Sequence, residues 1–138
     1  MPAKDIYHDA VRNALIKEGW TITNDPYILN IGSRDLFVDL GAEKLLSADK
    51  DEQKIAVEIK SFIGKSRVND LENALGQYTL YSDIMRDIDP NRRLYLAITK
   101  DVFETLFQEP IGEILLKNQR FNLLVFDAQQ EVVESWIP

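Results

Sequence analysis

Cysteine is missing from this chain of 138 residues, and histidine occurs once, as His8. Without cysteine there is no disulfide and no thiolate metal site. A single histidine also excludes a zinc site built from several histidines. The absence of cysteine fits a reducing compartment, and we expect the protein to be cytoplasmic.

Long apolar runs and an excess of basic residues are also lacking. No apolar run approaches the ~20 residues that a membrane span needs, and residues 1–9 do not resemble a signal peptide. Acidic residues outnumber basic ones by 23 to 16, for a net charge of −7. This balance argues against a general nucleic-acid coat, because phosphate contacts rely on lysine and arginine. A local DNA site, or a partner that adds basic surface, remains compatible with it.

Basic residues do gather in two places, and a solvated surface is the simpler interpretation of each cluster taken alone. The clusters are Lys60, Lys65 and Arg67, and Arg86, Arg92 and Arg93.

The remaining composition is that of an ordinary globular protein, with 45% hydrophobic and 28% charged residues. We expect residues 1–138 to form a single domain. Apolar periodicity predicts the following elements, with residues 20–26 as a turn region and 47–53 as a polar connection. Helices are expected over 5–18, 68–87, 101–108 and 111–118, and strands over 27–31, 35–40, 54–61, 93–99, 121–127 and 131–137. This order predicts an α/β fold with a mixed β-sheet flanked by helices.

Glu58 and Lys60 are the most informative residues of the sequence. Side chains alternate along a strand, so both point to the same face, ~7 Å apart. Charged groups on a strand that is otherwise apolar are costly unless something nearby uses them. A second acid, Asp39, ends the apolar strand over 35–40. If those two strands are neighbours in one sheet, Asp39 and Glu58 lie close together.

Two carboxylates with a lysine suit phosphodiester hydrolysis that depends on a divalent metal. Mg²⁺ or Mn²⁺ would take Asp39, Glu58 and the backbone carbonyl of Ile59 as ligands. Lys60 would orient or activate the attacking water and offset developing charge. Two alternatives stay open: Asp35 shares a strand face with Asp39 and is its rival, and Glu58 with Lys60 could form a plain salt bridge.

His8 and Gln77 are candidate auxiliary residues. His8 borders the apolar stripe of the first helix, where a histidine bonded to a carbonyl is the default interpretation. Gln77 borders the stripe of the second long helix and follows a glycine. It would orient a phosphate or a carboxylate if that helix lies over the sheet.

The pattern of Asp39 with Glu58-Ile59-Lys60, in the order αβββαβ, resembles the PD-(D/E)xK restriction-endonuclease-like superfamily. Over nearly its whole length the chain also resembles the XisH family, the excision-controlling factors of the fdxN element. The shared strings are Asp5-Ile-Tyr-His-Asp9, Glu18-Gly-Trp-Thr-Ile-Thr23, Asp39-Leu-Gly-Ala-Glu-Lys44, Ile55-Ala-Val-Glu-Ile-Lys-Ser-Phe62, Ala74-Leu-Gly-Gln-Tyr78 and Glu134-Ser-Trp-Ile137.

This resemblance implies a nuclease-like fold and a role in programmed, site-specific DNA excision during heterocyst development. It implies a site-specific recombinase and a XisI-like companion protein as partners. The superfamily's ligands map onto Asp39 and Glu58, its lysine onto Lys60, and a helical glutamine onto Gln77. His8 takes the place of a glutamate common on the first helix, and Val38 stands where a proline often precedes the first acid.

Three functions follow from these observations. The first is a Mg²⁺-dependent DNA endonuclease or nicking component. The second is a non-catalytic regulator with the same fold that binds a recombinase or the companion protein, which the net charge of −7 favours. The third is a small acidic domain with no metal. A homodimer is a reasonable expectation for a protein that acts on duplex DNA.

Overall fold

The computed structural model describes residues 4–46 and 51–138, so part of the polar connection expected over 47–53 lies outside it. The helices are α1 (His8–Lys17), α2 (Arg67–Ile88), α3 (Lys100–Thr105) and α4 (Pro110–Lys117), with a 3-10 turn η1 (Leu106–Gln108). The strands are β1 (Thr21–Asn24), β2 (Tyr27–Ile31), β3 (Arg34–Val38), β4 (Leu40–Leu45), β5 (Glu52–Ile59), β6 (Arg92–Thr99), β7 (Leu123–Asp127) and β8 (Val132–Ile137).

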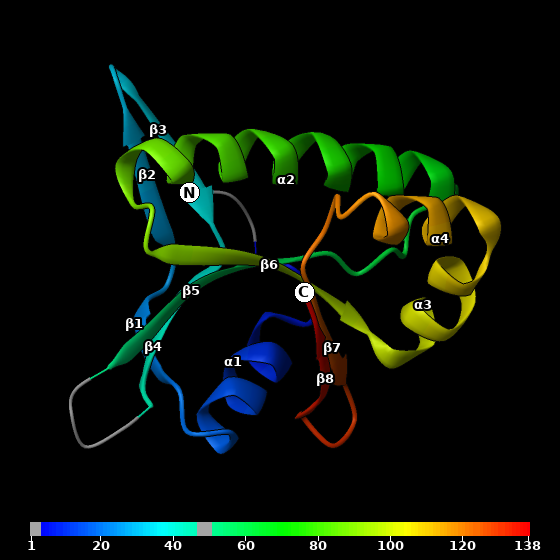
Figure 1. The fold of residues 1–138 in the computed structure, drawn as a ribbon. Coiled ribbons are helices and arrows are strands. Elements are labelled where there is room, and N and C mark those ends of the chain that lie inside the picture. The colour runs from blue at the N-terminus through cyan, green and yellow to red at the C-terminus, as the bar shows by residue number, and fades with distance from the viewer. Residues whose placement is uncertain (1–3, 47–50) are drawn as a thin grey trace.

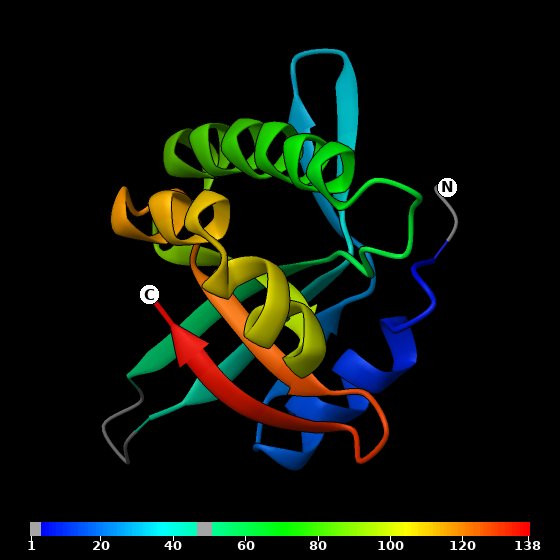
Figure 2. The same ribbon diagram turned by 90° about the vertical axis from the view of Figure 1, so that its right-hand side faces the viewer.

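Six strands form one mixed sheet in the order β1-β4-β5-β6-β7-β8. The central strands β5, β6 and β7 are parallel, whereas β1, β4 and β8 pair antiparallel with their neighbours. Helix α1 covers one face, and α2 with the α3–α4 segment covers the other (Figures 1 and 2). The predicted mixed sheet flanked by helices is therefore confirmed. None of the helices in the described part of the chain is both long and apolar enough to cross a membrane.

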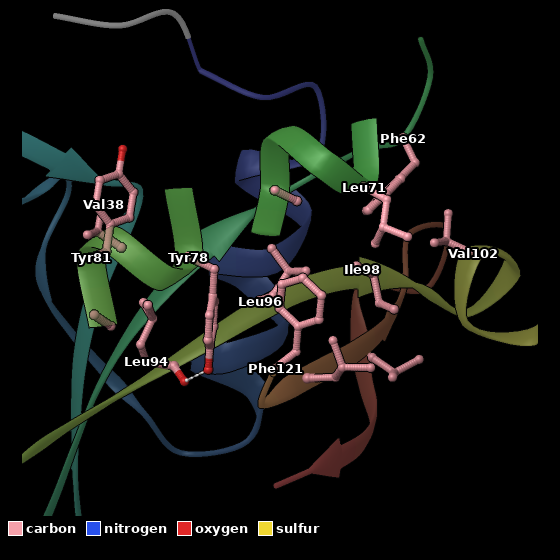
Figure 3. Packing of buried hydrophobic residues seen from close by; sticks show 14 of the residues in the cluster. Val38, Phe62, Leu71, Tyr78, Tyr81, Leu94, Leu96, Ile98, Val102 and Phe121 are labelled. Atoms are coloured by element: carbon pink, nitrogen blue, oxygen red, sulfur yellow. Dashed lines mark hydrogen bonds between the residues drawn. The ribbon is translucent and has the colours of Figure 1, made fainter. Parts of the chain in front are cut away.

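Alternation along β5 assigns each of its side chains to one of these two faces. Ile55, Val57 and Ile59 pack with α1 in one buried cluster. Ala56 belongs to the other cluster, beneath α2, which Figure 3 shows from close by. Because the side-chain period of a strand is two, Glu58 must face α2. The packing of β5 thus directs its acid toward the long helix.

Two strand expectations are wrong in detail. Residues 20–26 are not simply a turn region, because Thr21–Asn24 form the edge strand β1. The strand expected over 35–40 is two strands separated by a bend at Asp39. Strand β3 pairs only with β2 in a separate two-stranded sheet, and it is β4 that pairs with β5. The β2–β3 hairpin therefore rises out of the main sheet beside α2 (Figure 1).

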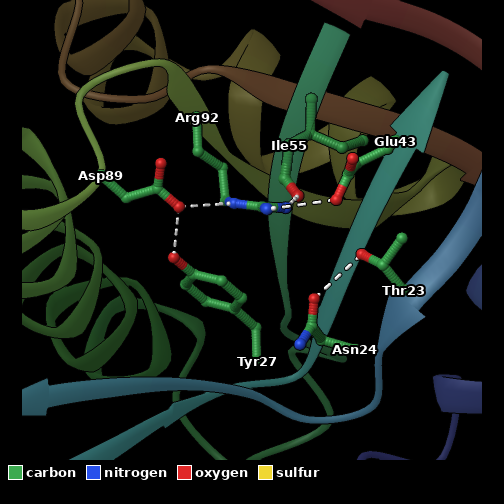
Figure 4. Close-up of polar contacts among 7 residues, drawn as sticks. All are labelled: Thr23, Asn24, Tyr27, Glu43, Ile55, Asp89 and Arg92. Atoms are coloured by element: carbon green, nitrogen blue, oxygen red, sulfur yellow. Dashed lines mark hydrogen bonds and ion pairs between the residues drawn. The ribbon is translucent and has the colours of Figure 1, made fainter. Parts of the chain in front are cut away.

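The guanidinium of Arg92 ties this hairpin to the sheet and to the end of α2 (Figure 4). Its Nε donates to Asp89 Oδ2 at 2.9 Å, and its Nη1 donates to the carbonyl of Ile55 at 2.9 Å. A third contact joins Nη2 to Glu43 at 3.6 Å. The ring of Tyr27, on β2, lies 4.6 Å from the guanidinium and its hydroxyl donates to Asp89 at 2.6 Å. Only 6% of the Arg92 side chain is exposed.

Replacing Arg92 with methionine should lower the free energy of unfolding by about 3 kcal/mol, because it leaves the Ile55 carbonyl and two half-buried carboxylates without their cation. Arg86→Met is the matched control, since Arg86 forms the same i,i+3 pair with Asp83 but is 69% exposed. That substitution should cost less than about 1 kcal/mol. Urea denaturation of both variants makes the comparison, and equal losses would contradict the structural role of Arg92.

Candidate metal-binding site at the end of β5

The register of β4 on β5 brings the two candidate acids together. Leu40 pairs with Val57, so Asp39, one residue earlier, stands beside Glu58. Asp39 Oδ2 accepts a hydrogen bond from the backbone N–H of Ile59 at 2.7 Å. The backbone N–H of Asp39 in turn donates to Glu58 Oε1 at 3.3 Å. The bend between β3 and β4 therefore holds Asp39 against the backbone of the last residues of β5.

These residues line a cavity of about 390 Å³. Strand β5 contributes Glu58 and Ile59, and Lys60 follows directly, its backbone N–H donating to Ala97 of β6 at 3.1 Å. Helix α2 covers the cavity with Gln77 and Tyr81, and the β2–β3 hairpin forms another wall. The remaining lining residues are Lys4, Asp5, Asp35, Leu36, Phe37 and Asp39.

Asp39 and Glu58 both have raised pKa values, because their carboxyls are partly buried. Burial, followed by the charge of Asp39, raises the pKa of Glu58 from 4.5 to about 9. Burial also raises the pKa of Asp39, against the opposing effect of the hydrogen bond from Ile59 N–H. A divalent cation between the two oxygens would remove this penalty by stabilising both ionised forms. The donor set thus fits a hard divalent ion.

The cavity offers a small rather than a large set of protein ligands. Within residues 4–46 and 51–138 no group of three His, Cys, Asp or Glu side chains is arranged to hold a metal ion. Two carboxylates remain, together with the Ile59 carbonyl. That carbonyl points to the same side of β5 as the Ile59 N–H that meets Asp39. Mg²⁺ is typically bound in this way, through one or two carboxylates with several waters.

Of the two auxiliary candidates, only Gln77 lines the cavity. Gln77 is exposed and lines the cavity from α2. His8 is buried but does not line it; His8 Nε2 instead lies 2.7 Å from Asp25 Oδ1. The rival acid Asp35 lines the same cavity from the exposed hairpin, where Asn30 donates to it.

Three polar lining residues were not among the predicted site residues or their rivals, namely Lys4, Asp5 and Tyr81. Asp5 accepts hydrogen bonds from the backbone N–H groups of Tyr7 and Ser61, at 2.9 and 3.1 Å. It thereby joins the start of α1 to the loop after β5. Tyr81 follows Gln77 by four residues, and this helical spacing is a signal that could have placed both on one face of α2.

The fold and the site together define a mixed α/β protein with a paired-carboxylate cavity at the end of a central strand. The family model described as "XisH protein" matches residues 1–134, and the chain belongs to the XisH family. The resemblance to the XisH family that the sequence indicated is thereby confirmed.

Two solved structures are similar to this chain over their full lengths. One is a XisH family protein from Nostoc punctiforme, 36% identical with a TM-score of 0.87, covering 97% of this chain and 100% of that one. The other is an fdxN element excision controlling factor protein from Anabaena variabilis, 39% identical with a TM-score of 0.86, covering 98% and 100%. No curated protein matches the chain.

Glu58→Gln should stabilise the protein at neutral and alkaline pH. The folded-state pKa of Glu58 lies above its ordinary value, so the wild type is most stable when this group is protonated. That stability is present below about pH 4.5 and is lost as the pH rises toward 9. The glutamine keeps an acceptor for the Asp39 N–H and carries no charge. We expect a gain on the order of 2 kcal/mol at pH 8 that shrinks toward zero near pH 4.

Thermal or urea unfolding across this pH range, without divalent ions, measures the difference between variant and wild type. Glu52→Gln, on the same strand but exposed, is the control and should change stability by less than about 0.5 kcal/mol. A Glu58→Gln variant that is less stable than wild type at pH 8 would contradict the raised pKa, because it would show that contacts of the ionised carboxylate outweigh the cost of its burial.

Proposed function

We propose that this protein is a Mg²⁺- or Mn²⁺-dependent endonuclease that cleaves or nicks DNA. The carrying observation is the close placement of Asp39 and Glu58, with Lys60, the residue after β5, lining the same cavity. Two oxygen ligands and a lysine in one cavity are what metal-assisted phosphodiester hydrolysis requires. The raised carboxyl pKa values support the proposal, because they mark a place where a cation is favoured.

We further propose a restriction-endonuclease-like core for this fold. The order α1, β1, β4, β5, α2, β6 follows αβββαβ, with the β2–β3 hairpin inserted between its first two strands. Strands β1, β4 and β5 form the antiparallel meander, and β6 is parallel to β5 after the α2 crossover. Asp39 then precedes the second core strand and Glu58 ends the third. This arrangement supports the assignment of both acids as ligands.

Each residue of the cavity has a defined task in this proposal. Asp39, Glu58 and the Ile59 carbonyl hold the ion, which when bound supplies charge neutralisation for the phosphate and a more acidic water. Lys60 orients that water and offsets the charge that develops on phosphate oxygens. Gln77, exposed on α2 above the cavity, orients the phosphate.

The biological setting we propose is programmed, site-specific excision of a DNA element. The Anabaena variabilis relative is described as an fdxN element excision controlling factor. DNA, a site-specific recombinase and a XisI-like companion protein are the proposed partners. The net charge of −7 supports a companion, because an additional basic surface would let an acidic protein approach DNA.

Substitution of Asp39 by asparagine should abolish metal-dependent nicking of supercoiled DNA, with a loss on the order of a hundredfold or more. Asp35→Asn is the matched control, because it removes the rival carboxylate from the same cavity and should leave nicking largely unchanged. Agarose-gel assays with Mg²⁺ or Mn²⁺, with and without the companion protein, provide the readout.

The same two variants test metal binding independently of cleavage. Saturating Mn²⁺, at about a hundred times its dissociation constant, should stabilise wild type and Asp35→Asn by about 2.7 kcal/mol. Asp39→Asn should gain little. Equal stabilisation of all three proteins would overturn the assignment of Asp39 as a ligand.

A non-catalytic regulator is the second candidate, and the acidic charge is the observation that favours it. Such a protein would use the fold to bind the recombinase, the companion or a second copy of itself. Lys60→Ala separates the two functions, since it should abolish excision if the protein is a nuclease and leave excision intact if it is a regulator. Co-purification with each partner and light scattering establish the complex and the oligomeric state.

A further inference from the structure

Tyr81 carries a polar group for which the fold itself has no evident use. Its side chain is 9% exposed, on the face of α2 that covers the carboxylate cavity. The buried polar side-chain atoms without a partner in the described residues are His8 Nδ1 and Trp20 Nε1, so the Tyr81 oxygen, unlike its ring, is open to solvent. Among the described residues none is hydrogen-bonded to the Tyr81 hydroxyl, which Figure 3 shows directed away from the packed core side chains. A phenylalanine would fill the same volume, so packing alone does not account for the hydroxyl.

Two other tyrosines beside α2 show the difference. The Tyr78 hydroxyl donates to the carbonyl of Leu94 at 2.9 Å and accepts from the N–H of Asn122 at 2.9 Å. The Tyr27 hydroxyl donates to Asp89. Both hydroxyls are part of the protein's internal hydrogen bonding. Tyr81 differs in that no described residue is hydrogen-bonded to its hydroxyl, and its side chain lines the carboxylate cavity.

The surroundings of Tyr81 make it a hydrogen-bond donor rather than a base. A phenol ordinarily has a pKa near 10, and burial raises that of Tyr81 further. The proton therefore stays on the oxygen at physiological pH. A protonated phenol at the wall of a cavity can donate to a ligand bound there, and an anionic oxygen is a stronger acceptor than water.

We propose that Tyr81 donates a hydrogen bond to a nonbridging oxygen of a phosphodiester bound at Asp39, Glu58 and Lys60. Tyr81 thereby becomes a further substrate-contacting residue, one helical turn beyond Gln77 on α2. The inference rests on the proposed nuclease function, because the phosphate must be held at the carboxylate cavity. It adds that α2 supplies two neutral donors on one side of the phosphate, while Asp39, Glu58 and Lys60 supply the charged groups on the other.

Thymidylyl-thymidine is the probe, because it contains a single phosphodiester and its contact is therefore unambiguous. Ca²⁺ replaces Mg²⁺ so that binding is measured without turnover. Affinity for wild type and for Tyr81→Phe is measured by NMR titration, and Mn²⁺ affinity is measured separately by electron paramagnetic resonance. Tyr81→Phe should bind the dinucleotide about tenfold more weakly, the expected effect of one hydrogen bond to a charged group. Its Mn²⁺ affinity and unfolding midpoint should stay unchanged.

Tyr78→Phe is the matched control, since it removes a hydroxyl that is bonded within the protein. It should lower stability and leave dinucleotide affinity unchanged. The two phosphorothioate diastereomers of the probe distinguish a direct hydrogen bond from a packing role, because packing alone would not make the effect of the substitution depend on which oxygen is replaced. Sulfur in place of the contacted oxygen should weaken binding to wild type more than binding to Tyr81→Phe, for one diastereomer only.

Equal affinity of wild type and Tyr81→Phe would overturn the inference and leave the nuclease proposal standing. Wild type that binds Mn²⁺ but not the dinucleotide would overturn both. Weaker binding by Tyr81→Phe, with the predicted diastereomer selectivity, supports the inference even if no cleavage is found, because contact and catalysis are then measured apart.

Discussion

The fold is constrained most by the partly buried contact between Asp39 and Glu58. Burial raises the pKa of both carboxyls, and the charge of Asp39 raises that of Glu58 further. A sequence selected only for stability would place apolar side chains there, or one charged side chain rather than two acids. The protein instead stabilises the arrangement through backbone hydrogen bonds, from Ile59 N–H to Asp39 and from Asp39 N–H to Glu58. Both bonds involve Asp39, the residue at the bend between β3 and β4.

The remainder of the fold holds that bend in position. Strand β4 enters the main sheet immediately after Asp39, while the β2–β3 hairpin leaves it. A hairpin outside the sheet needs another anchor, and Arg92 provides it by contacting Tyr27 on β2, Asp89 at the end of α2 and the Ile55 carbonyl on β5. Arg92 thus anchors the hairpin at Ile55, three residues before Glu58 on β5.

Sequence reasoning predicted the parts of the site that follow from strand periodicity. The period of two placed Glu58 and Lys60 on one face, and the end of an apolar strand identified Asp39. It did not predict β1 or β4, because β1 is a short, largely exposed edge strand and β4 follows β3 after a single residue. Both are defined by pairing across the sheet, which no local pattern encodes. Tyr81 was missed for a related reason, since its importance arises only where α2 crosses the cavity.

The acidic charge of the chain and its proposed action on DNA can be reconciled at the cavity itself. Acids outnumber lysines among its lining residues, with Asp5 and Asp35 in addition to the central pair. Such a surface repels a phosphate until a divalent ion reverses the local charge. DNA binding should then depend on the metal, unlike that of a protein with a permanent basic surface, whose affinity falls mainly with added salt. Under the proposed function the acidity would act as a control, because the cavity would accept a phosphate only when the divalent ion is present.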